Sequence, residues 1–350
     1  MIHLQDRIAG TLMTHRALKI IPSIESKNWQ EILSDLITDP KELLHILRLD
    51  INKKPVSLSA LSQFPLRVPR PFVEAMQPNN WNDPLLLQIW PSKDEETSPS
   101  EYTSDPLYEV KFNPVAGLLH KYRARVLLTA APHCAIHCRY CFRRHFDYQS
   151  NTPSREDWSN SLDYIKADPS IQEVILSGGD PLAISDKHLL WLIRELESIS
   201  HLKILRIHSR VPIVLPQRIT PQLIAMIDQS RFDVVVVVHC NHSQEVSDKV
   251  KQGIETLRLS KVTLLNQSVV LAGINDDPEI LKELSYTLFS LSILPYYLHL
   301  PDKVMGTSHF SVSPEKAIRI VNTLRKELPG YLVPTLVQEE PGALSKTRLV

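Results

Sequence analysis

The sequence lacks a charge excess of either sign, a long apolar run and an apolar leader. Lys and Arg together number 39, as do Asp and Glu, which gives a formal net charge of zero. Without a basic field, we expect no general binding to nucleic acid. The longest β-branched run, Val234 to Val238, is far too short to cross a bilayer, and Met1 to Pro22 has charged residues where a secretory signal needs an apolar core. These absences predict a cytoplasmic protein that binds neither nucleic acid nor membrane.

Cysteine is also scarce, and its distribution is informative. The sequence has four cysteines, too few and too crowded for a disulfide framework. Cys134, Cys138 and Cys141 have the spacing C-x3-C-x2-C directly after an apolar run from Val126 to Ala131. Three thiols in one short loop after a strand predict a metal site with these cysteines as ligands.

The number of thiols limits the choice of metal. Structural zinc takes four ligands, so zinc would need one more from the nearby histidines, which are His133, His137 and His145. An iron–sulfur cube held by three thiolates keeps one iron open for chemistry. Cys240 could complete four thiolates and make an electron-transfer site, although a small buried thiol is the commoner fate. The spacing favours a [4Fe-4S] cluster and leaves zinc as the alternative.

Three segments are expected along the chain. Residues 1–105 are predicted to be a helical amino-terminal segment, with helices over 26–38 and 41–49 and extended chain over the proline-rich residues 64–71. Residues 92–106 are the most polar stretch and are predicted to be an exposed loop or linker. Residues 106–330 are predicted to be the core, and residues 331–350 a carboxyl-terminal segment.

A repeating pattern predicts the fold of the core. Six apolar runs are predicted as strands, over residues 126–131, 171–176, 203–207, 233–238, 262–270 and 293–300. Six segments with helical features follow them, over residues 155–166, 186–198, 221–229, 244–259, 278–291 and 314–328. Such repeats predict an α/β fold with parallel strands. Since polar residues mark all six strand ends, and not one switch point, the pattern favours a partial (β/α)6 TIM-like barrel over an open doubly wound sheet.

The strand ends supply candidate site residues. Ser177, Gly178, Gly179 and Asp180 follow the second predicted strand, where the glycines let the backbone approach a ligand and Asp180 offers a carboxylate. An ordinary strand-to-helix turn would also use such glycines. The later ends carry His208, Ser209, Arg210, His239, Cys240, Asn241, His242, Asn266, Gln267, Ser268, His299 and Asp302. In a barrel, all of these residues would face one end.

Several motifs resemble one enzyme family. The cysteine loop is similar to the signature of radical S-adenosylmethionine (SAM) enzymes. Residues 138–146 (CRYCFRRHF), 176–182 (LSGGDPL), 211–220 (VPIVLPQRIT) and the lysine in 341–347 (PGALSKT) resemble lysine 2,3-aminomutases, and the resemblance runs from about residue 64 to residue 346. It implies a barrel of the radical SAM type and an isomerase that converts L-α-lysine to (R)-β-lysine. The implied cofactors are a [4Fe-4S] cluster, SAM and pyridoxal 5′-phosphate (PLP).

The resemblance also implies which residues hold the cofactors. The cluster ligands would be Cys134, Cys138 and Cys141. The residues near SAM would be Ser177, Gly178, Gly179, Asp180, His239 and Gln267. Lys346 matches the catalytic lysine that binds PLP, and Lys121 and Arg125 match the basic pair for its phosphate.

Substrate residues follow from the same resemblance. Arg143 matches the arginine that binds the α-carboxylate, and Asp302 and Glu339 match the acids that bind the ε-ammonium, with Glu340 beside Glu339. An aminomutase for glutamate or arginine is an alternative, although glutamate would meet like charge at these acids. A non-catalytic zinc-binding protein is the alternative from another class.

The partners are implied in the same way. The motifs most resemble aminomutases that serve modification of elongation factor P. This implies free lysine, or lysine attached to elongation factor P, as the substrate, and a reductant such as flavodoxin or ferredoxin. Longer aminomutases bind zinc through cysteines in a carboxyl-terminal extension. No cysteine follows Lys346 here, so we expect neither that zinc nor the associated oligomerisation.

Overall fold

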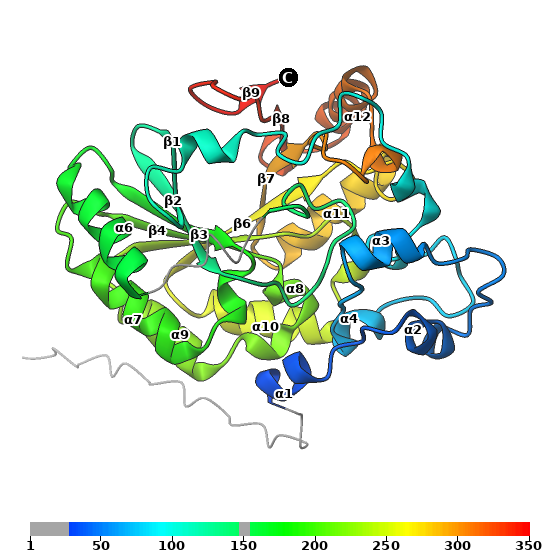
Figure 1. The fold of residues 1–350 in the computed structure, drawn as a ribbon, viewed down its shortest axis with the longest axis horizontal. Helices are drawn as coiled ribbons and strands as arrows, with labels where there is room; N and C mark the ends of the chain where they lie inside the picture. Colours follow the sequence, from blue (N-terminus) through cyan, green and yellow to red (C-terminus); the bar gives the residue numbers. More distant parts are fainter. Residues whose placement is uncertain (1–27, 147–154) are drawn as a thin grey trace, which may run out of the picture.

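The computed structural model describes residues 28–146 and 155–350. In this part of the chain, nine strands form one sheet in chain order (Figure 1). The strands are β1 (Leu118–Tyr122), β2 (Arg125–Ala131), β3 (Glu173–Gly178), β4 (Ile204–Ser209), β5 (Asp233–Val238), β6 (Val262–Val269), β7 (Leu294–His299), β8 (Thr335–Gln338) and β9 (Thr347–Arg348). Strands β2 to β8 are parallel, whereas β1 and β9 pair antiparallel at the two edges.

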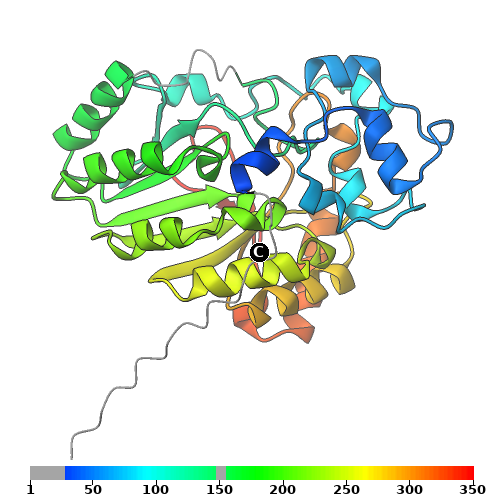
Figure 2. The same ribbon diagram turned by 90° about the horizontal axis from the view of Figure 1, so that it is seen from below.

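Helices connect the parallel strands and cover the outer face of the curved sheet (Figures 1 and 2). They are α6 (Arg155–Ala167), α7 (Asp186–Glu197), α9 (Pro221–Asp228), α10 (Asp248–Arg258), α11 (Pro278–Ser290) and α12 (Pro314–Glu327). Each crossover moves the chain one strand further in the same direction, which curls the sheet into a partial barrel. The predicted partial barrel is confirmed. A doubly wound sheet would reverse its strand order at a switch point, and the described sheet does not.

Helix α7 shows how the sequence specifies these elements. The Ser185 hydroxyl caps the helix by accepting from the amide of His188, which satisfies one of the donors that a helix start leaves free. Leu189, Leu192, Ile193 and Leu196 recur at helical spacing and are buried against the sheet. This apolar stripe stabilises the helix through packing more than through intrinsic propensity.

Differences from the predicted elements are local. Helix α10 begins at Asp248 and not at residue 244, because the Ser247 hydroxyl caps it and residues 243–245 form a separate turn. The sequence analysis did not predict β1, β8, β9 or the short helix α8 (Val211–Val214). It also did not predict the single-turn helices η3 (Pro181–Ala183), η4 (Pro216–Arg218), η5 (Ser243–Glu245), η6 (Ser308–Phe310) and η7 (Gly330–Leu332).

The amino-terminal segment packs against the barrel, with its helix α4 beside α8 (Figure 1). Its elements are α1 (Trp29–Ser34), α2 (Pro40–Leu47), α3 (Leu58–Gln63), α4 (Arg70–Val73), α5 (Pro84–Leu87), η1 (Lys93–Glu96) and η2 (Glu109–Phe112). Buried side chains of this segment, such as Phe72 and Trp90, belong to the same apolar core as the barrel strands. The segment therefore shares its core with the barrel.

Two expectations for this segment were confirmed only in part. Residues 92–106 are mostly exposed, as predicted, but they are not simply a loop, because they include η1 and its buried Glu95. The extended chain predicted over residues 64–71 ends at Pro69, because α4 begins at the next residue. Pro71 lies in the first turn of this helix, a position that tolerates proline. The leader prediction for Met1 to Pro22 lies outside the described residues. Where the chain is described, no helix has both the length and the apolar character to cross a membrane.

Candidate functional site

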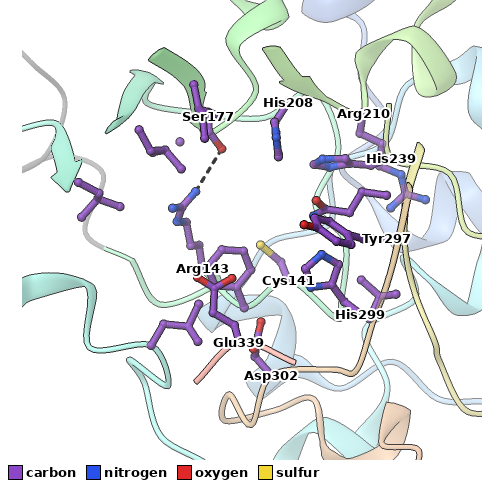
Figure 3. Close-up of a pocket in the computed structure, with 18 of the residues that line it drawn as sticks. Cys141, Arg143, Ser177, His208, Arg210, His239, Tyr297, His299, Asp302 and Glu339 are labelled. Atoms are coloured by element: carbon purple, nitrogen blue, oxygen red, sulfur yellow. Dashed lines mark hydrogen bonds between the residues drawn. The ribbon is translucent and has the colours of Figure 1, made fainter. Parts of the chain in front are cut away.

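A cavity of about 330 Å³ lies at the carboxyl ends of the parallel strands (Figure 3). Every residue that the family resemblance assigns to a cofactor or to the substrate lines it, from β1 to the segment after β8. These residues are Lys121, Arg125, Cys134, Cys138, Cys141, Arg143, Ser177, Gly178, Gly179, Asp180, His239, Gln267, Asp302, Glu339 and Lys346. The fold therefore brings this set together, while the individual roles stay predictions. Of the other strand-end candidates, His208, Arg210 and His299 also line the cavity. The remaining ones are not among its lining residues, and they are Ser209, Cys240, Asn241, His242, Asn266 and Ser268.

The cysteine loop follows β2 and contributes three unbridged thiols to the cavity wall. Burial raises the pKa of Cys134 and raises the pKa of Cys141 to about 11, and the neighbouring thiols add to both shifts. Cys134 and Cys141 would ionise together only beside a positive centre that stabilises the thiolates. Among the described residues, no three His, Cys, Asp or Glu side chains form a site for a single metal ion.

Arg210, at the end of β4, anchors this loop from inside the barrel. Its Nη1 donates to the Sγ of Cys138 at 2.6 Å and to the Tyr140 hydroxyl at 2.5 Å. Its Nη2 donates to Gln88 at 2.7 Å and to Glu245 at 3.2 Å. The sequence analysis placed Arg210 at a strand end without giving it a role. Its contacts fix the middle of the cysteine loop to the barrel.

The Gly178–Gly179 turn is packed directly against the same loop. The amide of Gly179 donates to the carbonyl of Ala131 at 2.9 Å, and the amide of Asp180 donates to the carbonyl of His133 at 3.0 Å. A Cβ on Gly179 would lie 2.3 Å from the His133 carbonyl oxygen, and Gly178 has a φ of +102°. Both positions need glycine, because a side chain would separate the turn from the loop or strain the backbone.

The Asp180 carboxylate accepts hydrogen bonds from the chain itself. One oxygen accepts from the Ser209 hydroxyl at 2.6 Å and from the amide of Leu182 at 3.0 Å. The other accepts from the amides of Arg210 at 2.7 Å and Val211 at 3.1 Å. Burial nonetheless raises the pKa of Asp180. The carboxylate therefore ties the end of β3 to the end of β4 beside the cavity.

One wall of the cavity carries buried polar atoms without a protein partner. The Nε2 atoms of His208, His239 and His299 and the Oε1 of Gln267 have no hydrogen-bond partner among the residues described. Figure 3 shows the three imidazoles grouped along this wall. Burial lowers the pKa of each histidine, to about 4 for His239, so all three are neutral at pH 7. Buried polar atoms cost free energy unless they are paired, which indicates that a ligand satisfies them.

The opposite wall is charged, and its arginine has a carboxylate partner that the sequence did not reveal. Arg143 donates through Nε and Nη2 to the two oxygens of Glu109, each at 2.8 Å, and through Nη1 to Ser177 at 3.3 Å (Figure 3). The side chains of Arg143 and Glu109 are both about 6% exposed. This two-bond geometry fixes the plane of the guanidinium. Glu109 begins η2, in a stretch with no strand-end or motif signal.

Lys346, Glu339 and Lys121 form a connected charge group next to this pair. Lys346 donates from its ammonium to Glu339, whose other oxygen lies 3.6 Å from the Lys121 ammonium. Lys121 is also 3.7 Å from Glu109. Burial alone would raise the pKa of Glu339, but the two lysines outweigh it and lower this pKa to about 2. Burial raises the pKa of Asp302 to about 7, and the charge of Glu339 adds to the shift.

Aromatic side chains complete the cavity and were also not predicted. Arg125 lies 4.6 Å from the ring centre of Tyr122, and Lys346 lies 6.0 Å from that of Tyr297. Tyr122 donates to Glu339 at 3.3 Å. The tyrosines gave no separate signal because aromatic residues inside apolar strands are expected as core.

Comparison with known proteins agrees with this geometry. Residues 128–284 match the radical SAM superfamily. An L-lysine 2,3-aminomutase from Haemophilus influenzae is 47% identical over 323 residues, which cover 92% of this chain and 96% of the relative. One from Escherichia coli is 45% identical, covering 96% of this chain and 98% of its own. The solved structure of a radical SAM methyltransferase from Sphaerobacter thermophilus, 14% identical, covers 63% of this chain and 68% of its own with a TM-score of 0.46.

The relatives from H. influenzae and E. coli align with this chain over more than nine-tenths of both lengths. At these identities over nearly the whole chain, the alternative of a non-catalytic zinc-binding protein is wrong, and the predicted isomerase class is confirmed. The chain belongs to the lysine 2,3-aminomutase family of radical SAM enzymes.

Proposed function

We propose that the protein is a PLP-dependent lysine 2,3-aminomutase that converts free L-lysine to (R)-β-lysine. The observation that carries this proposal is the meeting of three kinds of side chain in one cavity. A thiol trio, a lysine and a set of charges complementary to lysine all line it. Family membership implies a [4Fe-4S] cluster, SAM and PLP as cofactors.

The side chains present fit the cluster and SAM. We propose Cys134, Cys138 and Cys141 as the cluster ligands, since three thiols on one loop leave one iron free for SAM. His239 and Gln267 offer the unpaired polar atoms that a polar ligand would satisfy. Since the Asp180 carboxylate is occupied by the chain, we assign it to positioning the Ser177–Gly179 backbone, which then faces SAM.

The side chains also fit PLP. Lys346 would hold it covalently, and Lys121 and Arg125 would neutralise its phosphate at the β1–β2 edge. In the structure, Lys121 lies between the carboxylates of Glu109 and Glu339, which keep this cation in place. When bound, the cluster and SAM supply the radical and PLP supplies the carrier for the amino group, so the chain itself has to bind and orient.

The charged wall supports lysine as the substrate. Arg143, whose guanidinium plane is fixed by Glu109, would bind the α-carboxylate. Asp302 and Glu339 would bind the ε-ammonium. A glutamate side chain would meet repulsion at these acids. A lysine attached to elongation factor P through its carboxyl group would have no carboxylate for Arg143. We therefore favour free lysine over attached lysine.

The partners follow from the resemblance of the motifs. We propose that the β-lysine serves the modification of elongation factor P and that flavodoxin or ferredoxin supplies the electron. The product's use is testable separately, by asking whether β-lysine made by this enzyme appears on elongation factor P.

The decisive experiment is a rearrangement assay. Reduced, reconstituted protein is incubated with SAM, PLP and isotope-labelled lysine, arginine or glutamate, and β-amino acids are measured. We expect β-lysine alone. Lys346→Ala should abolish it and leave the iron content unchanged, while Lys303→Ala, at an exposed position, should match the wild type. Wild-type protein with a full cluster and bound PLP that forms no β-lysine would contradict the proposal.

A further inference from the structure

Two buried arginines lie next to the last two cysteines of the loop. Arg139 follows Cys138 and is fully buried. Arg144 lies three residues after Cys141, and 6% of the whole residue is exposed. Guanidinium groups rarely sit in a protein interior without a counter-charge, because the loss of hydration is costly. The partner of these two arginines therefore affects how the cysteines are held.

That partner is Glu95, from the polar stretch before the barrel. Its Oε1 accepts from the Arg139 Nε at 2.8 Å, and its Oε2 accepts from the Arg144 Nη2 at 2.6 Å and from Arg139. All three side chains are at most 1% exposed. The Glu95 carboxylate also accepts from the amide of Ser92 at 3.1 Å, which fixes it at the start of η1. One carboxylate thus links two guanidiniums without competition from water.

Other donors of the arginines bind backbone carbonyls on both sides of the loop, whereas the buried Nε of Arg144 has no partner among the residues described. Arg139 donates to the carbonyl of Phe64 and to that of Ala60 at 3.1 Å. Arg144 donates to the carbonyl of Gly306 at 2.9 Å, where a Cβ would lie 2.9 Å from Nη1. Glu95 therefore stands at the centre of a buried network that joins the amino-terminal segment, the cysteine loop and the chain after β7.

The backbone of the loop rests on the same segment. The amide of His137 donates to the carbonyl of Arg67 at 2.9 Å, and the amide of Arg139 donates to the carbonyl of Gln88 at 2.8 Å. The relative positions of Cys138 and Cys141 thus depend on residues 60–95, which precede the loop in sequence. Glu95 supplies one negative charge to two buried guanidiniums, and this carboxylate is the electrostatic condition for the arrangement.

We propose that Glu95 is a positioning residue of the cluster site, which holds the cysteine loop in shape through Arg139 and Arg144. The proposal rests on the proposed role of the three cysteines as cluster ligands. It makes the amino-terminal segment a structural part of that site. Glu95 is not among the residues that line the cavity, so it would act through the two arginines.

The test compares Glu95→Gln with Glu101→Gln, which neutralises an exposed carboxylate of the same stretch. Both proteins are reconstituted anaerobically, and iron and sulfide content, the rate of cluster loss to a chelator, and the EPR spectrum of the reduced cluster with and without SAM are measured. We expect Glu95→Gln to lose its cluster about 10-fold faster, as happens when groups supporting metal ligands are changed, and to show an altered response of the spectrum to SAM. Glu101→Gln should match the wild type.

Folding is followed by circular dichroism and thermal unfolding. If Glu95→Gln does not fold, Glu95→Asp carries the test, since it keeps the charge and shortens the side chain. Folded Glu95→Gln or Glu95→Asp with wild-type cluster retention and spectra would overturn the proposal. Absence of a cluster in the wild type would instead contradict the role of the cysteines, so the two failures are distinguishable.

Discussion

Asp302 should make lysine binding depend on pH in the neutral range. Burial raises the pKa of this carboxyl to about 7, and repulsion by Glu339 adds to the shift, although Lys346 and Lys121 oppose it. A neutral carboxyl attracts the substrate ε-ammonium much less than a carboxylate does. Substrate must therefore bind the ionised form, and binding at neutral pH should release a proton.

The size of the effect follows from the pKa. With a pKa of about 7, roughly one-eleventh of Asp302 is ionised at about pH 6 and roughly ten-elevenths at about pH 8, so the association constant for lysine should rise about 10-fold over this range. Two neighbouring groups, Glu339 and His239, do not change charge over this pH range. The pKa of Glu339 is about 2 and that of His239 about 4, and the ε-ammonium of lysine titrates only at about 10.4.

Calorimetric titration of L-lysine into protein reconstituted with the cluster, without PLP or SAM, measures this constant and the released proton. Asp302→Asn should remove the pH dependence and weaken binding at the upper pH, where the wild-type carboxylate is ionised. Asp163→Asn, at an exposed position on α6, should keep the wild-type slope. Equal wild-type affinities at about pH 6 and about pH 8, or an unchanged slope in Asp302→Asn, would refute the reasoning.

Three further substitutions test other parts of the site. Gly179→Ala places a Cβ 2.3 Å from the His133 carbonyl oxygen, so it should destabilise the protein by about 3 kcal/mol in thermal unfolding and reduce iron content. An unperturbed melt would show that the loop moves aside at little cost. Glu109→Gln leaves buried Arg143 without its carboxylate. It should lower the free energy of unfolding by about 3 kcal/mol and raise KM for lysine. An unchanged KM would show that Glu109 does not affect substrate binding. Cys240→Ala should keep full iron content, because this thiol is buried, bonds to the His242 carbonyl and lies outside the cavity lining; lost iron would make it a ligand.

The parallel strands β2 to β7 were predictable because each contains a run rich in apolar residues. Val234 to Val238 shows the case clearly, since a continuous β-branched run has no polar face to give to water. Once the strands were predicted, their carboxyl ends were predicted too, and with them the positions of His239, Asp302 and the glycine turn. Strands β1 and β9 carry no such pattern. Strand β9 has only two residues and forms by pairing with the edge strand β8. A local sequence pattern does not contain the information about that pairing.

Two of the residues that sequence reasoning missed, Glu95 and Glu109, are carboxylates that are buried through their arginine partners. Glu95 lies among acidic neighbours in the most polar stretch, and Glu109 lies in a short single-turn helix. Either would ordinarily be a surface charge. Each becomes buried because an arginine of the cysteine loop meets it, and that meeting depends on the tertiary fold.

Arg143 and Arg144 are consecutive, yet their carboxylate partners lie in different places. Arg143 is bound by Glu109 at the cavity, and Arg144 is bound by Glu95 from the amino-terminal segment. The cysteine loop is therefore held from two sides by residues that precede the barrel. The comparisons differ in this same part of the chain. The superfamily match begins only at residue 128, whereas the lysine 2,3-aminomutases of H. influenzae and E. coli match over more than nine-tenths of the chain. If the loop needs these two carboxylates to keep its shape, the preceding segment belongs to the aminomutase site, and the barrel alone would not complete it.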